Sequence, residues 1–155
     1  MISPERLRAY PYFAGANEES LRELAMASEE LTFQEGQVLF REDQTAEHLY
    51  ILIRGEVDIQ YELNTGEHRT VDTVVAGDVL VWSALVRPYR TTALAIARRM
   101  SEVIAIDSYV IGTIAKNCAR RSTKTPGMAN GLSVHLTTTE GPSVRIAVTN
   151  AASTR

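Results

Sequence analysis

The chain has 155 residues, of which 45% are hydrophobic, and its 16 basic and 19 acidic residues give a formal net charge of −3. A charge this small argues against a protein built around a polyanion or a charged membrane surface, and the apolar content argues against disorder throughout. The single cysteine, Cys118, excludes an intramolecular disulfide framework and a cysteine-rich zinc site. We expect one globular domain plus an extension, from a reducing compartment.

No stretch approaches the roughly 18 consecutive apolar residues of a membrane-spanning helix, and the start runs straight into polar residues. We therefore expect a soluble, cytoplasmic protein with no membrane partner. His48, His68 and His135 stand far apart, so the sequence predicts no metal site and no metal-dependent barrel enzyme. No Ser/His/Asp order, phosphate-loop lysine or paired-cysteine motif is present. We expect no catalytic residue and no enzymatic activity.

The segment from Glu18 to Leu31 has the spacing of an amphipathic helix. The residues that this helix would place on one face are Leu21, Leu24, Ala25 and Ser28. Asn17 precedes the segment as a candidate N-cap, and acidic residues fill the predicted first turn. The apolar residues before Gly15 predict a further helical turn. All of these apolar residues are expected to serve core packing.

After Thr32 the sequence changes to short apolar runs separated by glycines and acidic residues, which is typical of β-strands joined by turns. Regularly spaced short strands of this kind indicate an antiparallel sandwich or jelly roll. Residues 64–67 predict a hairpin loop, and a last strand over Glu102–Ile106 precedes a short helix over Tyr109–Ala115. Four glycines fall where a strand should turn or end: Gly36, Gly55, Gly66 and Gly77.

Beyond Lys116 the composition changes again. Eleven of the 39 residues from Asn117 to Arg155 are serine or threonine, and glycines and prolines interrupt the segment. Two stretches, Leu132–Leu136 and Val144–Val148, alternate apolar and polar residues. The pattern fits either a β-hairpin added to the domain or an ill-ordered tail. We therefore divide the chain into a domain over residues 1–116 and an extension over residues 117–155.

The order of these elements, with the residues at their turns, resembles the cyclic nucleotide-binding domain of the catabolite-activator and Fnr regulator family. The resemblance covers roughly residues 4–116. Its strongest part is the register of glycines: Glu35-Gly36 enters the first strand, Gly55 follows the run from Tyr50 to Arg54, and Gly77-Asp78 opens the phosphate-binding cassette. The resemblance implies a mainly β fold with flanking helices, a double-stranded β-helix or jelly roll.

In the resembling family the cassette binds a cyclic phosphate with backbone N–H groups at the start of a short helix and with an arginine. A carboxylate accepts a hydrogen bond from the ribose. By this resemblance Gly77 and Asp78 open the cassette, and its short helix runs near Trp82 to Leu85. The implied ligand is cAMP or cGMP, with no other cofactor. The implied ligand-binding residues are Gly77, Asp78, Val79, Ser83, Ala84, Arg90, Thr91 and Thr92.

The sequence departs from the family pattern at the cassette. Asp78 is one methylene shorter than the usual glutamate, and the connection from Trp82 to Pro88 is bulkier than usual. If Thr92-Ala93 occupy the small-hydroxyl and alanine positions, Arg90 stands one residue early. Because successive side chains of a strand face opposite sides, this offset turns Arg90 away from the phosphate unless the backbone bulges before Thr91.

Two functions follow from this interpretation. The first is a regulatory ligand-sensing module that binds a cyclic nucleotide, and the second is a structural or protein-interaction module on the same fold. An inward Arg90 with open space beside Gly77 favours the sensor, whereas an outward Arg90 with Trp82 or Tyr89 filling the pocket favours the interaction module. The segment after Lys116 lacks the apolar periodicity of a dimer helix, so we expect no direct DNA binding by this chain. A homodimer and a separate partner protein both stay open.

Overall fold

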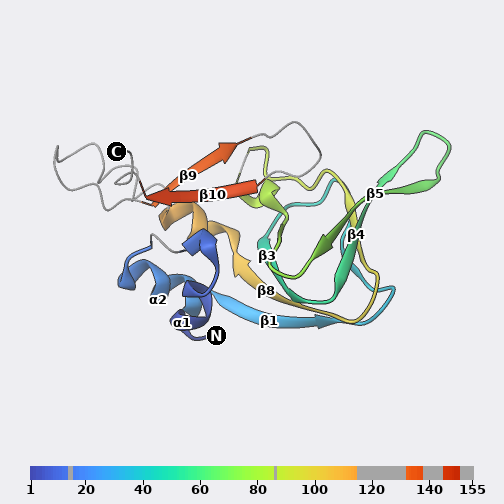
Figure 1. Ribbon diagram of the computed structural model, residues 1–155. Helices are drawn as coiled ribbons and strands as arrows, with labels where there is room; N and C mark the ends of the chain where they lie inside the picture. Colours follow the sequence, from blue (N-terminus) through green and yellow to red (C-terminus); the bar gives the residue numbers. More distant parts are fainter. Residues whose placement is uncertain (14–15, 86, 115–131, 138–144, 151–155) are drawn as a thin grey trace. The chain divides into compact units, whose positions relative to one another are not determined.

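The computed structural model describes residues 1–13, 16–85, 87–114, 132–137 and 145–150. Its contacts form two compact units, one of residues 29–108 and one that combines residues 1–28 with the chain from Tyr109 onward. No helix in the described ranges is long and apolar enough to cross a membrane. We describe each unit by itself, with the elements labelled as in Figure 1.

The unit of residues 29–108 holds two four-stranded sheets (Figure 1). The first sheet runs in the order β1 (Ser28–Phe33), β8 (Ser101–Asp107), β3 (His48–Arg54), β6 (Val79–Leu80). The second runs β2 (Val38–Phe40), β7 (Leu94–Ala97), β4 (Glu56–Glu62), β5 (His68–Val75). Strand β3 is antiparallel to β6 and β8, β4 is antiparallel to β5 and β7, and β2 is antiparallel to β7. The predicted mainly β jelly roll is confirmed.

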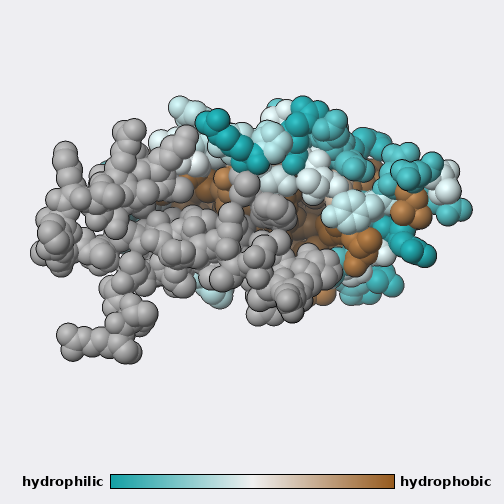
Figure 2. Space-filling view, turned by 90° about the horizontal axis from the view of Figure 1, so that it is seen from above, coloured by the Kyte–Doolittle hydropathy of each residue, from teal (hydrophilic) through white to brown (hydrophobic). Residues whose placement is uncertain are grey.

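The core of the roll is built by apolar residues that face one another across paired strands. Ile51 on β3 lies opposite Ile104 on β8, and Leu52 lies opposite Val103. All four side chains are fully buried. On the face seen in Figure 2, hydrophilic residues cover much of the described surface and apolar residues show between them. The burial of these branched side chains explains why this apolar sequence forms central strands.

The four predicted turn glycines all have positive φ, between 81° and 100°. The constraint is tightest at Gly55, between β3 and β4. A Cβ added there would lie 2.6 Å from the Met100 carbonyl oxygen and 2.7 Å from Ser101 Cα, closer than real Cβ contacts. The predicted hairpin loop is also confirmed, since Leu63 N donates to the Glu67 carbonyl at 2.8 Å between β4 and β5.

The other unit contains helices α1 (Pro4–Arg8) and α2 (Glu18–Met26) and the 3-10 turn η1 (Pro11–Phe13). The Asn17 side chain accepts from Ser20 N at 2.8 Å, which confirms the predicted N-cap. The helix prediction through Leu31 is wrong, because α2 ends at Met26 and residues 28–33 form β1. The Ser28 hydroxyl donates to the Leu24 carbonyl, and the chain then pairs as a strand beside β8. Sheet pairing prevails over the helical spacing there.

Residues 108–114 form a helix, and the predicted helix position Ala115 and the single cysteine, Cys118, lie outside the described residues. Farther along, strands β9 (Leu132–Thr137) and β10 (Arg145–Asn150) pair with each other in antiparallel register. Val134 lies opposite Val148 and Leu136 opposite Ile146. The sequence allowed either a β-hairpin or an ill-ordered tail in this extension. The structure has the two paired strands of a hairpin.

Candidate functional site

The segment of residues 77–92, which we call the cassette segment, connects β5 to β7. It begins with Gly77 and Asp78 at the turn into β6. Gly77 N donates to the Leu52 carbonyl at 2.7 Å, and Leu52 N donates to the Asp78 carbonyl at 2.9 Å. The Asp78 carboxylate accepts from Val75 N at 3.2 Å. This exposed side chain therefore closes the turn before β6.

A short 3-10 helix, η2 (Trp82–Leu85), follows β6 at the expected position. The Ala84 amide donates to the Val81 carbonyl at 2.9 Å, and the side chains of Ser83 and Ala84 are buried. Val81, directly before η2, has φ +62°, which is rare for a β-branched residue. The other described non-glycine residues with positive φ are Tyr89, in this segment, and Asp43, which contacts it. Such positions cluster at functional sites.

The exit of the cassette segment is bound to the loop between β2 and β3. Asp43 N donates to the Thr91 carbonyl, Thr91 N donates to the Gln44 carbonyl, and Ala46 N donates to the Tyr89 carbonyl, each at 2.8 Å. The Thr91 hydroxyl is buried; it accepts from Gln44 N at 2.9 Å and lies 2.5 Å from the Arg41 carbonyl, to which it donates. These contacts fix the backbone on both sides of Arg90.

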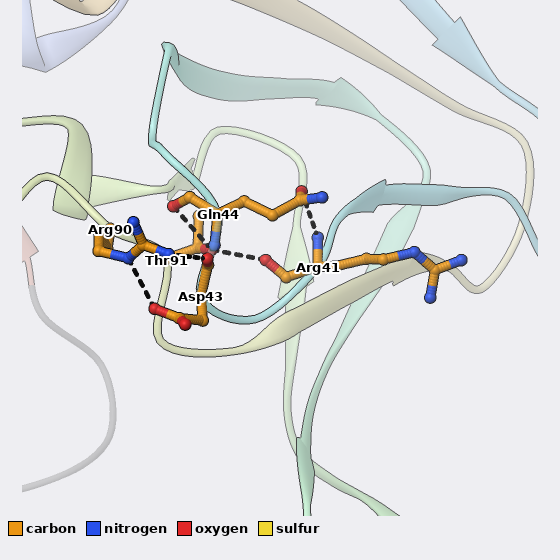
Figure 3. A network of polar contacts seen from close by, with 5 residues as sticks. All are labelled: Arg41, Asp43, Gln44, Arg90 and Thr91. Atoms are coloured by element: carbon orange, nitrogen blue, oxygen red, sulfur yellow. Dashed lines mark hydrogen bonds and ion pairs between the residues drawn. The ribbon is translucent and has the colours of Figure 1, made fainter.

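The Arg90 side chain extends along this loop to Asp43 (Figure 3). Its Nε donates to Asp43 Oδ1 at 2.6 Å, and its Nη2 donates to the Asp43 carbonyl oxygen at 2.5 Å. The Arg90 side chain is 49% exposed and that of Asp43 is 79% exposed. Among the described residues, Nη1 has no hydrogen-bond acceptor. Asp43 therefore holds the Nε and Nη2 edge of the guanidinium and leaves Nη1 without an acceptor in the part of the chain that the structure describes.

Residues 90–93 at the exit alternate between exposed and buried positions, as expected for successive side chains of an extended chain. Thr91 and Ala93 are buried, whereas Arg90 and Thr92 are exposed. Val79, at the start of the segment, lies opposite Ile51 on β3. Of the implied ligand-binding residues, Arg90, Thr91 and Thr92 are thus consecutive at the exit, with Thr91 buried and the other two exposed.

Asp78 and Arg90 lie at opposite ends of β3. Asp78 is hydrogen-bonded to Leu52, whereas Arg90 forms a β-bridge with Thr45, which precedes β3. The extended chain from His48 to Leu52 alone spans about 13 Å. The backbone contacts of Asp78 and Arg90 are thus made at different points along β3 and the loop before it.

The family model for the cyclic nucleotide-binding domain matches residues 30–117 of the chain. A putative cyclic nucleotide-binding protein from Geobacter metallireducens is 35% identical, with a TM-score of 0.70, and the match covers 79% of this chain and 89% of that one. The chain belongs to the cyclic nucleotide-binding domain family. A search of curated proteins finds no match. The family is a regulatory ligand-binding domain.

Two further structures share the fold of this cyclic nucleotide-binding domain. The regulatory domain of Toxoplasma gondii PKA, crystallised with cAMP, is 24% identical with a TM-score of 0.65 over 76% of this chain and 45% of that one. The sensor domain of the transcriptional regulator DNR from Pseudomonas aeruginosa is 16% identical with a TM-score of 0.62 over 80% of this chain and 93% of that one. At these identities the likeness shows the fold alone.

Sequence reasoning missed the residues that hold the cassette exit in this domain. Arg41, Asp43 and Gln44 lie 47 to 50 residues before their partners and carry no motif of their own. The one available signal was the polar run between two apolar runs, which marks a loop. A loop position identifies neither the strand end that it will meet nor the arginine that it will pair with.

We expect the Asp43 carboxyl to titrate below the usual range of aspartate, because the hydrogen bond from Arg90, and then its positive charge, lower the pKa of Asp43. Since the folded-state pKa lies below the unfolded one, the pair's contribution to stability is complete above the unfolded pKa and is lost as the pH falls through the folded pKa. Carboxyl NMR shifts followed through the acidic range measure this midpoint. Arg90→Ala should raise it, and an unchanged midpoint would contradict the pairing.

Proposed function

We propose that this domain is a regulatory ligand-sensing module that binds a cyclic nucleotide, cAMP or cGMP, with the phosphate against Arg90. The observation that carries the proposal is the orientation of the guanidinium. Asp43 engages Nε and Nη2 from one side, and Nη1 is left without a protein acceptor among the described residues. A guanidinium offers five N–H donors in a rigid fork, so an anionic phosphate oxygen can be bound at the open edge.

The surroundings of Arg90 support a preformed site. The backbone bonds between the β2–β3 loop and residues 89–91 hold Arg90 in place before any ligand arrives, and preorganisation reduces the ordering cost of binding. The role in ribose binding that the resemblance implies for Asp78 stays a prediction.

The test is calorimetric titration of the chain with cAMP and with cGMP. We expect micromolar binding of at least one nucleotide and at least a tenfold loss in Arg90→Ala, since a hydrogen bond to a charged group contributes about 1.5–3 kcal/mol. Arg87→Ala is the matched control, because Arg87 is an exposed arginine of the same segment. We expect its affinity to stay within twofold of the wild type. Absence of heat at millimolar nucleotide would refute the sensor.

One observation favours the second candidate, a protein-interaction module without a nucleotide. Arg90 lies on the exposed side of its strand and is already ion-paired with Asp43 at 2.6 Å. A domain that has lost its ligand can keep such a pair for structure alone. This candidate predicts that neither nucleotide binds.

A further inference from the structure

We propose that Asp72 and Asp78 keep the outer edge of strand β5 from pairing with the same edge of a second copy of this chain. Strand β5 is last in the order β2, β7, β4, β5 of its sheet, so β4 is its one strand neighbour in that sheet as described (Figure 1). An edge of eight residues is long enough to act as a template for a strand of another chain. The inference concerns self-association and does not depend on nucleotide binding.

The outward-facing backbone groups of β5 follow from the bonds of its inner neighbour, β4. The Glu56 carbonyl accepts from Arg98 N at 2.9 Å, so the backbone of Glu56 is directed toward the β7 side of β4. Val75 is paired with Glu56, and Thr73 with Asp58 two residues along. In an antiparallel ladder, pairs that exchange hydrogen bonds alternate with pairs that do not. The amides of Thr73 and Val75 therefore point away from β4.

Both of these outward amides are already bonded to an aspartate of the same chain. Thr73 N donates to Asp72 Oδ1 at 2.8 Å, and Val75 N donates to Asp78 Oδ2 at 3.2 Å. The Val75 carbonyl is occupied as well, because it accepts from Asp78 N at 3.1 Å. A strand added to this edge would need the same two amides for its own carbonyl oxygens. It would first have to displace two charged acceptors, whose hydrogen bonds are the stronger kind.

The side chains of this edge favour pairing, so the caps have something to prevent. Val71 and Val75 are 40% and 50% exposed, and valine is among the residues that pack best in strands. The β4–β5 register shifts between Ile59 and Gln60, which leaves Val71 as the extra residue of a bulge. A bulge twists an edge locally. The amides of Thr73 and Val75 lie beyond it, in the regular part of the ladder, and there the aspartates take over the protection.

A second copy of the chain is the partner that fits this edge in charge. Antiparallel pairing of two identical strands places the start of one beside the end of the other, and the contact is the same for both copies. The start of β5 carries His68 and Arg69, whereas its end carries Asp72 and no basic residue. Pairing therefore brings no like charges together. The caps, and not charge repulsion, are what separates the two edges.

The experiment is sedimentation velocity of the full chain over a range of concentrations, without ligand. Asp72→Ala/Asp78→Ala removes both caps. Asp72→Asn/Asp78→Asn is the matched control, because it removes the same two charges and keeps an acceptor oxygen at each position. We expect the mass of the alanine variant to rise with concentration and to level off at twice the wild-type mass, since each copy has one β5 edge. The asparagine variant should sediment as the wild type.

Amide hydrogen exchange tests whether this association uses β5. In the dilute alanine variant we expect the Thr73 and Val75 amides to exchange at least about tenfold faster than in the wild type, because each loses a hydrogen bond to a charged group. At high concentration their protection should return, because the amides then pair with the second copy. Renewed protection at these two amides separates edge pairing from association through any other surface.

Three results overturn the inference. They are an alanine variant that keeps the wild-type mass at every concentration, equally strong association of the asparagine variant, and association without renewed protection of Thr73 and Val75. The backbone bonds of Asp78 do not involve its side chain, so we expect the alanine variant to fold, which thermal unfolding checks. If it does not fold, Asp72→Ala against Asp72→Asn gives the same comparison at the Thr73 amide. None of these results bears on nucleotide binding.

Discussion

Replacing Gly55 with alanine is expected to destabilise the roll by about 3 kcal/mol. A left-handed backbone costs a residue with a Cβ about 1–2 kcal/mol, and forcing atoms into a packed site costs about 1–3 kcal/mol more. Both costs apply, because Gly55 has φ +100° and the new Cβ would lie 2.6 Å from the Met100 carbonyl oxygen. Since Ser101 begins β8 and Met100 directly precedes it, relief requires the β3–β4 turn or the start of β8 to shift.

Gly66→Ala separates the two costs. Gly66 also has positive φ, +81°, yet nothing lies within 4 Å of an added Cβ. We expect a loss of about 1–2 kcal/mol, from backbone strain alone. Urea denaturation of the wild type and both variants measures the difference. Equal losses in the two variants would show that the close approach at Gly55 contributes nothing.

Replacing Thr91 with valine is expected to cost about 2 kcal/mol of stability, because it leaves buried polar groups without partners. The lost hydroxyl accepts from Gln44 N and donates to the Arg41 carbonyl. Valine has nearly the same shape, so the change isolates the hydrogen bonds from the packing. Thr92→Val is the matched control: Thr92 is the next residue along and is exposed, and we expect a change within about 0.5 kcal/mol.

Thr91→Val also tests whether nucleotide binding depends on the hydrogen bonds of the Thr91 side chain. Thr91 follows Arg90 directly, and its side chain ties the cassette exit to the loop that carries Asp43. Loss of this tie should weaken nucleotide binding in Thr91→Val, whereas Arg87→Ala, the exposed control of the same segment, should keep the wild-type affinity. Calorimetry on the wild type, Thr91→Val, Arg87→Ala and Arg90→Ala ranks these effects. A Thr91→Val domain with wild-type affinity would show that the tie serves the fold alone.

The fold was accessible from sequence because its signals are local. A turn glycine or an alternation of apolar residues indicates the structure of only a few neighbouring positions. The roll contains several strands and turns of this kind, so these local signals recur along the chain. Residues 28–33 show where local reasoning fails. Their spacing continues the helical pattern of α2. They nevertheless form β1, because they pair with β8, and this tertiary pairing cannot be predicted from local spacing.

The site was less accessible, because its geometry depends on distant pairings. The glycine register located the cassette segment, and alternation correctly placed Arg90 and Thr91 on opposite sides of the strand. The points at which Asp78 and Arg90 contact β3 and the loop before it depend on strand register, which local spacing does not report. The contact between Asp43 and Arg90 joins residues that are 47 positions apart. The residues around either one do not indicate that the other will be its partner.

The ladder between residues 43–46 and 89–91 has a consequence for what counts as the functional unit. It joins two chain segments that β3, β4, β5, β6 and η2 separate in the sequence, so the groups that orient Arg90 come from both sides of these elements. A peptide of residues 77–92 would retain every cassette side chain and yet lack the groups that orient Arg90. The proposed recognition of a phosphate by Arg90 therefore depends on the closed roll, and a graft into another scaffold would have to carry both sides of the ladder.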